Sequence, residues 1–228
     1  MFVIYRISDT GYKKEKPDYI NNKNCFINAL RTFNKADWLI IADNVGDETK
    51  SLITQSNKEI KYVNVGHGAG TFNLALDYAL NLPDNEIVYF LENDYLHKPE
   101  ADKIIEDGFE LGFDYVTTYD HPDKYLNPFE GGNLLCSGRS EETRLYLGQY
   151  CHFKLTNSTT MTFASKVKTL KEDEGILRKW TSETYPYDFN MFAELRQKGK
   201  RLASSLPGYS THGETQWLSP LTNWKQEL

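Results

Sequence analysis

Two acids and an amide stand directly after a continuous apolar run in the middle of the chain. The run from Ile87 to Leu91 ends in Glu92, Asn93 and Asp94. Such a run is typical of a strand buried on both faces of a parallel sheet, and α/β sheets bind ligands at the carboxyl ends of their strands. Because Mg²⁺ and Mn²⁺ take carboxylates together with phosphate oxygens, Asp94 is the expected ligand of a divalent metal, with Glu92 or Asn93 assisting. A polar turn that only caps the sheet is the alternative.

A glycine-rich turn, residues 66–71, separates another predicted strand from a predicted helix. Small residues there would let backbone amides at a helix N-terminus approach a phosphate. Gly68, Gly70 and Thr71 are therefore expected to bind the phosphates of a nucleotide. The turn matches neither the Rossmann fingerprint nor the Walker loop, and an ordinary turn explains it equally well.

Further nucleotide contacts are expected at the ends of the first two strands. Asp43 and Asn44 could read a base edge through hydrogen bonds, although such residues also favour turns for local reasons. Arg6 and Ser8, with Lys13 in the following loop, could contact the nucleotide as well. The alternative for these three residues is a solvated surface position.

Two residues of the second half could take part in the reaction. His212 lies in a glycine-flanked tail segment, where it could bind a metal or donate to a diphosphate; a surface histidine is the alternative. Asp188 begins a predicted helix, so it could be a general base for an acceptor hydroxyl or an ordinary helix cap. Glu183 is the competing carboxylate.

Apolar patterns predict the elements that must position these residues. Strands alternate with helices through the first half, which is typical of a doubly wound α/β fold with a mostly parallel sheet. The second half is less regular, and its tail is expected to wrap the domain. The predicted strands are 2–7, 38–42, 60–65, 87–91, 115–119 and 155–163, and the predicted helices are 24–33, 47–55, 71–81, 99–111, 166–180 and 188–198, with a loop at 120–148 and the tail at 206–228.

Composition restricts the partners and the compartment. A net charge of -6 argues against a nucleic-acid partner. Three widely spaced cysteines outside any CxxC pattern indicate reduced thiols in a cytoplasm. The N-terminus reads as a strand rather than a signal peptide, and no apolar run is long enough for a transmembrane segment. We therefore expect a cytoplasmic protein.

Taken together, the opening strand, the acid after the second strand, the glycine turn and the acidic triplet resemble the GT-A fold of nucleotide-sugar-dependent glycosyltransferases. The segment Phe90 to Asp94 resembles the DxD motif of that fold, with Glu92 and Asn93 departing from the usual acids. The resemblance covers most of the chain. It implies one domain, residues 1–228, with a Rossmann-like nucleotide-sugar-binding part at 1–119 and a smaller acceptor side with the C-terminal tail at 120–228.

The resemblance also implies an activity. The chain would be a metal-dependent hexosyltransferase, with Mn²⁺ or Mg²⁺ on Asp94 and His212, that moves a sugar from a donor, by default a UDP-sugar, to a hydroxyl of a glycan or another acceptor. Asp188 matches in position the base of inverting members, which are preferred here over retaining ones. The chain lacks the Q-x-x-R-W signature of processive synthases, so transfer of a single sugar is expected.

Two other functions stay open at this point. One is a nucleotidyltransferase acting on sugar phosphates, although the segment from Ser8 to Lys16 does not match the glycine- and Lys/Arg-rich opening loop of such enzymes. The other is a non-enzymatic carbohydrate-binding module, which would agree with an aromatic content of 14%.

Overall fold

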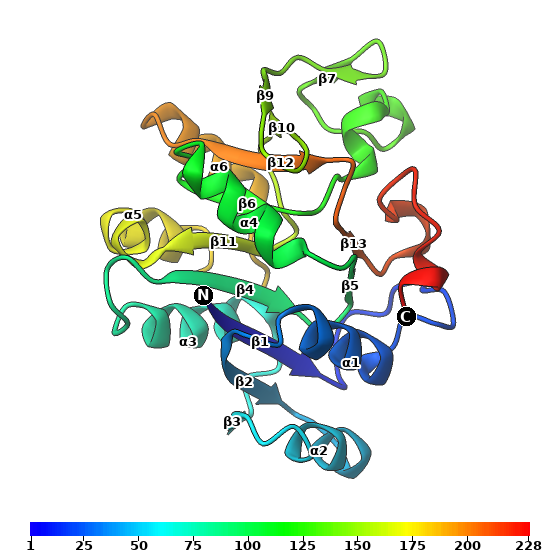
Figure 1. The fold of residues 1–228 in the computed structure, drawn as a ribbon, viewed down its shortest axis with the longest axis vertical. Coiled ribbons are helices and arrows are strands. Elements are labelled where there is room, and N and C mark those ends of the chain that lie inside the picture. The colour runs from blue at the N-terminus through cyan, green and yellow to red at the C-terminus, as the bar shows by residue number, and fades with distance from the viewer.

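A computed structural model describes residues 1–228, and a nine-stranded sheet forms its centre (Figure 1). The strand order is β3-β2-β1-β4-β11-β6-β12-β10-β9. Neighbouring strands are parallel from β3 to β4, β11 is antiparallel to both of its neighbours, and β12 returns to the direction of β6. The predicted α/β fold with a mostly parallel central sheet is confirmed. The strands are β1 (Phe2–Ser8), β2 (Asp37–Asp43), β3 (Glu59–Val63), β4 (Ile87–Glu92), β6 (Tyr115–Thr117), β9 (Leu145–Leu147), β10 (His152–Leu155), β11 (Phe163–Lys166) and β12 (Leu202–Leu206).

Helices cover both faces of this sheet because side chains alternate along each strand. In β1, Tyr5 belongs to one apolar cluster and its neighbour Ile4 to the other. The first cluster includes Phe26 of α1 and Ile104 of α4, whereas the second includes Phe72 of α3. Burial on both faces explains the near-continuous apolar runs in the central strands. The helices are α1 (Asn22–Thr32), α2 (Asp47–Thr54), α3 (Gly68–Ala79), α4 (Ala101–Glu110), α5 (Val167–Lys179) and α6 (Asp188–Gln197).

Two predicted elements differ clearly from the structure. Helix α3 begins at Gly68 rather than Thr71, because the His67 side chain caps it and the glycine turn becomes its first turn. The predicted strand 155–163 is mostly a loop, because only its end residues belong to strands, Leu155 to β10 and Phe163 to β11, and residues 156–162 connect the two. Thr160 and Met161 break that strand, because their φ values of 47° and 60° lie in the left-handed region.

A short second sheet connects the middle of the chain to its tail. Strand β5 (Tyr95–His97) follows the acidic triplet and pairs antiparallel with β13 (Ser210–His212). The register places His212 opposite Tyr95. The pairing therefore brings a tail segment, predicted only as a loop, against the end of β4.

The remaining elements are short. A hairpin joins β7 (Cys136–Ser137) to β8 (Ser140–Glu141), and single 3₁₀ turns are η1 (Pro122–Tyr125), η2 (Pro128–Glu130), η3 (Thr215–Trp217) and η4 (Trp224–Glu227). All three cysteines are buried and unpaired. None of the helices is both long and apolar enough to cross a bilayer.

Candidate active site

A polar cleft of about 420 Å³ lies at the carboxyl ends of β1, β2 and β4. The chain turns from β1 toward β2 on one side and reaches β4 on the other, so this is the point where the strand order reverses. Crevices at such points are the usual ligand sites of open α/β sheets. Eight of the residues predicted from the sequence line it, namely Arg6, Ser8, Asp43, Gly68, Thr71, Glu92, Asn93 and Asp94.

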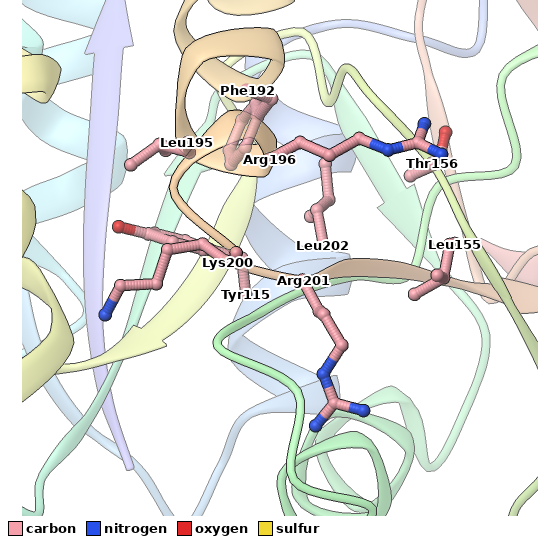
Figure 2. A pocket seen from close by; sticks show the side chains of 10 residues that line it. Tyr115, Leu155, Thr156, Phe192, Leu195, Arg196, Lys200, Arg201 and Leu202 are labelled. Atoms are coloured by element: carbon pink, nitrogen blue, oxygen red, sulfur yellow. The ribbon is translucent and has the colours of Figure 1, made fainter.

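A smaller cavity of about 140 Å³ lies between α6 and the starts of β6 and β12 (Figure 2). Two of its lining residues, Tyr115 and Leu202, are the first residues of their strands. Lys200, which also lines it, already forms an ion pair of 2.7 Å with Glu172. This cavity is therefore at the amino ends of the strands, opposite to the edge where α/β sheets bind ligands.

Asp94 and His212 meet at the wall of the cleft. The β5–β13 pairing sets His212 Nε2 at 3.4 Å from Asp94 Oδ2. Both residues are buried, and the rings of Tyr95 and Tyr119 lie against the imidazole with centroid distances of 5.5 and 6.2 Å. The expected pairing of these two residues is thus present, but His212 is a buried strand residue rather than part of an open loop.

Two lysines that the sequence analysis did not select hold this pair. Lys16 Nζ lies 2.9 Å from Asp94 Oδ2, and Lys14 Nζ lies 2.9 Å from His212 Nε2 and 3.7 Å from Asp94 Oδ2. Burial alone would raise the pKa of Asp94, but His212, Lys14 and Lys16 outweigh it and hold that pKa well below its usual range. Lys13, which had been considered for nucleotide contact, is not among the cleft residues.

The expected metal site is therefore built differently. No group of three or more His, Cys, Asp or Glu side chains in residues 1–228 is arranged to hold a metal ion. Asp94 and His212 are ligands of a suitable kind, and Asp94 Oδ1 is buried without a hydrogen-bond partner. The two atoms that face each other, Asp94 Oδ2 and His212 Nε2, already contact the ammonium groups of Lys16 and Lys14. Two unit charges 4 Å apart near a protein surface interact by about 4 kcal/mol, and a divalent ion doubles this. In this arrangement the residues do not fit Mn²⁺ or Mg²⁺.

Neither neighbour of Asp94 in the acidic triplet joins the pair. Glu92 Oε1 lies 3.2 Å from a guanidinium nitrogen of Arg6. Asn93 donates from its amide to the Ser8 carbonyl at 3.2 Å and to the side chain of Asn22. Both side chains therefore contact residues other than Asp94 and His212.

Arg6 lies under the cleft floor and is almost fully buried. Its guanidinium donates to the carbonyls of Gly68 at 3.2 Å and Met161 at 2.9 Å. Together with the ion pair to Glu92, these bonds engage both terminal nitrogens of the guanidinium that was expected to contact a nucleotide, and Nε is left without a partner. Arg6 instead joins β1 to the start of α3 and to the segment before β11.

Asp43 and Asn44 are bound mainly to each other and to the turn after β3. The Asp43 carboxylate accepts from the amides of Val65 at 2.7 Å and Gly66 at 2.9 Å, and from the Asn44 side chain at 3.0 Å. Asn44 has a φ of 51° and does not line the cleft. Both side chains therefore make the local hydrogen bonds that the turn alternative predicts.

The glycine turn offers fewer free amides than expected. The Gly70 amide donates to His67 Nδ1 at 3.1 Å, and the Ala69 amide to the Thr184 carbonyl at 3.5 Å. Gly70 does not line the cleft, and a Cβ there would lie 2.3 Å from Val65 Cγ1, so the glycine serves close packing. Gly68 and the Thr71 hydroxyl remain at the cleft wall.

Asp188 reaches across to the segment 156–162, which we call the threonine loop. Its Oδ2 accepts from the amides of both Thr159 and Thr160 at 2.7 Å, which leaves Oδ1 to accept from a ligand. Tyr187, not Asp188, is the N-cap of α6. The helix-cap alternative was therefore wrong, because this carboxylate binds another part of the chain. Asp188 does not line the cleft.

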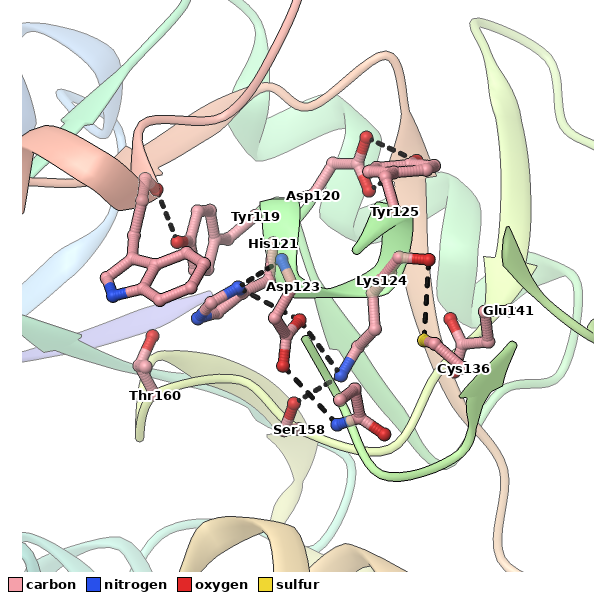
Figure 3. Close-up of polar contacts among 12 residues, drawn as sticks. Tyr119, Asp120, His121, Asp123, Lys124, Tyr125, Cys136, Glu141, Ser158 and Thr160 are labelled. Atoms are coloured by element: carbon pink, nitrogen blue, oxygen red, sulfur yellow. Dashed lines mark hydrogen bonds and ion pairs between the residues drawn. The ribbon is translucent and has the colours of Figure 1, made fainter. Parts of the chain in front are cut away.

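Buried charges continue behind the threonine loop (Figure 3). Lys124 Nζ donates to the side chains of Asn157 and Ser158 at 2.7 Å each. Asp123 lies 3.3 Å from the same ammonium and 2.9 Å from His121. These contacts hold the first residues of the loop, so both of its ends are fixed by charged side chains from other elements.

Sequence comparison gives no relative, because neither the protein-family models nor the curated proteins contain a match. Solved structures do match. S. aureus TarS, residues 1–349, is 15% identical with a TM-score of 0.56, over 89% of this chain and 57% of that one. GalNAc-T7 with UDP, GalNAc and Mn²⁺ is 10% identical with a TM-score of 0.62, over 95% of this chain and 44% of that one. A197 from STIV is 16% identical with a TM-score of 0.47, over 96% and 91%.

TarS and GalNAc-T7 are GT-A glycosyltransferases. The chain spans about half of the length of each. At these identities the likeness concerns the backbone, and it extends over nearly all of this chain. The protein therefore has the GT-A fold.

Proposed function

We propose that this chain is a glycosyltransferase that moves one sugar from a nucleotide-sugar donor to a hydroxyl of a glycan or another acceptor. A UDP-sugar is the expected donor. One observation carries the proposal: in a GT-A fold, a polar cleft lies where the strand order reverses and is lined by Asp94, with His212 buried directly behind that carboxylate. GalNAc-T7, which shares the fold, has UDP, GalNAc and Mn²⁺ in its structure. Fold alone does not define a reaction, so the site residues must support the rest.

The nucleotide is assigned to the part of the cleft lined by Ser8, Gly68 and Thr71, and its diphosphate to the end near Asp94. In this proposal residues 1–119 bind the donor, and residues 120–228 supply the acceptor side and the tail. The Ser8 hydroxyl exchanges a hydrogen bond only with the nearby Thr10 hydroxyl at 3.1 Å and the Thr10 amide. It is therefore readily available to a ligand.

Asp188 is assigned as the general base. Its two bonds to the threonine loop fix the carboxylate, and Oδ1 takes the proton of the acceptor hydroxyl. The acceptor oxygen then forms a bond to the anomeric carbon while the bond from that carbon to the phosphate oxygen breaks, and the nucleoside diphosphate leaves. Direct attack of this kind inverts the anomeric centre.

The fold implies a divalent ion, and its contribution to this proposal is limited to positive charge for the leaving group. The leaving diphosphate needs positive charge near Asp94 and His212, whether from Mn²⁺, Mg²⁺ or the side chains present. Because Lys14 and Lys16 contact both residues, no step of the reaction is assigned to a metal.

The test begins with binding. A ligand that binds only the folded state raises its apparent stability, so melting temperatures should be measured with UDP, GDP, ADP, CDP and dTDP and their sugars. A shift with one nucleoside diphosphate is expected, and that donor is then incubated with a glycan array. Release of the nucleoside diphosphate supports the transferase. A parallel incubation with the nucleoside triphosphate and a sugar phosphate tests the other reaction, since release of pyrophosphate there indicates a nucleotidyltransferase. If no nucleotide stabilises the folded protein, the proposal fails.

A further inference from the structure

We propose that Lys14 and Lys16 bind the diphosphate of the donor and supply, as two ammonium groups, the positive charge that Mn²⁺ would otherwise supply. The inference rests on the proposed function and deepens it, because it names the groups that neutralise the leaving group and predicts donor binding without a divalent ion.

The first support is position. Both lysines line the cleft, and both ammonium groups converge on the Asp94–His212 pair, the place where a GT-A metal was expected. Their side chains are 27% and 30% exposed, so they are open to a ligand in the cleft rather than sealed in the core. A bound diphosphate at this end of the cleft would lie within reach of both.

The second support is hydrogen-bonding capacity. An ammonium group has three N–H donors and no acceptor. Lys16 uses one donor on Asp94 Oδ2, and Lys14 uses one on His212 Nε2, with the Asp94 oxygen 3.7 Å away. Each lysine therefore keeps donors for phosphate oxygens. At this end of the cleft two ammonium groups face the single carboxylate of Asp94. The other acids that line the cleft are engaged elsewhere: Glu92 pairs with Arg6, and Asp9 and Asp43 accept from the amides of Gly46 and Val65.

The third support is a fixed backbone. Glu15, the residue between the lysines, accepts through its carbonyl from the amide of Thr215 at 2.8 Å and from the Thr215 hydroxyl at 3.0 Å. Gly213 passes so close that a Cβ there would lie 2.8 Å from the Asp94 carbonyl oxygen. The segment bearing the lysines is thus attached to the segment bearing His212. Charges fixed in this way need little reorganisation when a ligand binds.

The experiment is a titration of UDP, and of the nucleoside diphosphate found above if it differs, into the full chain with EDTA and with Mn²⁺. Wild-type protein is expected to bind in EDTA, with Mn²⁺ changing Kd by less than about threefold. Lys14→Met and Lys16→Met should each weaken diphosphate binding about tenfold or more, as loss of a charged hydrogen bond predicts. Lys16→Arg should recover most of the affinity.

Lys13→Met is the matched control, because Lys13 belongs to the same segment but does not line the cleft. Its Kd should stay within about twofold of wild type. The parent nucleoside, which has no phosphate, should bind wild type and lysine variants equally. If the double variant does not fold, the single variants and Lys16→Arg still decide the question.

Two results would overturn the inference while leaving the proposed function intact. One is diphosphate binding that requires Mn²⁺ in the wild type. The other is a folded Lys14→Met, Lys16→Met variant that binds the diphosphate as tightly as wild type. Mn²⁺ alone, titrated by electron paramagnetic resonance, should show no tight site in wild type. Failure of every nucleotide to bind would instead reject the proposed function itself.

Discussion

Two pairs of lysines, one beside the cleft and one at η1 and β10, neutralise acids in different ways. Lys14 and Lys16 contact Asp94 with side chains 27% and 30% exposed. Lys124 of η1 and Lys154 of β10 are 1% and 4% exposed, and Lys154 lies 2.9 Å from Asp120 and 3.8 Å from Glu141. These two lysines have their partners inside the protein. Lys14 and Lys16 keep part of their surface free, which suits the proposed contact with a ligand.

Substitution of Asp188 should give the largest effect on activity, since this residue is the proposed general base and has one carboxylate oxygen left for a ligand. Asp188→Asn is expected to lower kcat by about 10²–10⁴-fold, the usual contribution of a general base. The amide oxygen can still accept from Thr159 and Thr160, so the melting temperature should change little. Initial rates of nucleoside diphosphate release measure this. A loss of only a few-fold would count against the assignment.

Lys154 should dominate stability. Removing one partner of a buried ion pair leaves an uncompensated charge, so Lys154→Met should lower the free energy of unfolding by about 3–5 kcal/mol. Lys16→Met, at a partly exposed pair, should cost about 1 kcal/mol or less. Urea denaturation of both variants tests the comparison directly. If both variants lost the same free energy of unfolding, the two lysine pairs would contribute equally to stability.

Asp94 should make stability depend on acid pH. Its pKa in the folded state is lowered, so its contribution is fully present above the ordinary value near 3.8 and is lost as pH falls through the folded value. Asp94→Asn should lose about 1.5–3 kcal/mol at pH 7, the range for a hydrogen bond to a charged group. Unfolding measured from pH 7 to pH 2 should show the difference from wild type shrinking in acid. A constant difference would contradict the lowered pKa.

Glu141 should behave in the opposite way and more weakly. Burial raises its pKa above the ordinary value of 4.5, despite Lys124 and Lys154, so its ionised form opposes folding at neutral pH. Glu141→Gln should therefore raise the free energy of unfolding at pH 7 by about 1 kcal/mol or less, within the usual range for one substitution. The gain should disappear below about pH 4, where wild-type Glu141 is itself protonated. Destabilisation at pH 7 would show that its lysine contacts outweigh burial.

The sequence predicted the first half of the fold well, for a physical reason. Strands β1, β2 and β4 are buried on both faces, so their apolar runs are continuous and their ends coincide with polar residues. The threonine loop was predicted as a strand because threonine favours extended structure. Contacts from Asp188 and Arg6 override that preference, and contacts of this long range leave no local pattern.

The site was predictable only in part. Asp94 could be found because it follows a buried strand, and His212 was linked to it by resemblance to GT-A proteins rather than by spacing. Lys14 and Lys16 look the same as Lys13 in a polar segment, where a lysine is normally solvated. Only the β5–β13 pairing and the Glu15–Thr215 bonds reveal which of the three reaches Asp94.

Because β5 pairs with β13, the candidate site needs a later part of the chain than the main sheet does. All nine strands of the main sheet lie within the first 206 residues. The histidine beside Asp94 and the anchor for the lysine segment come only after residue 206. During synthesis the strands of the main sheet are thus complete before His212 and Thr215 leave the ribosome. The proposed diphosphate site is therefore assembled last, and a chain that ends before Ser210 would lack both the histidine and the anchor of the lysine segment.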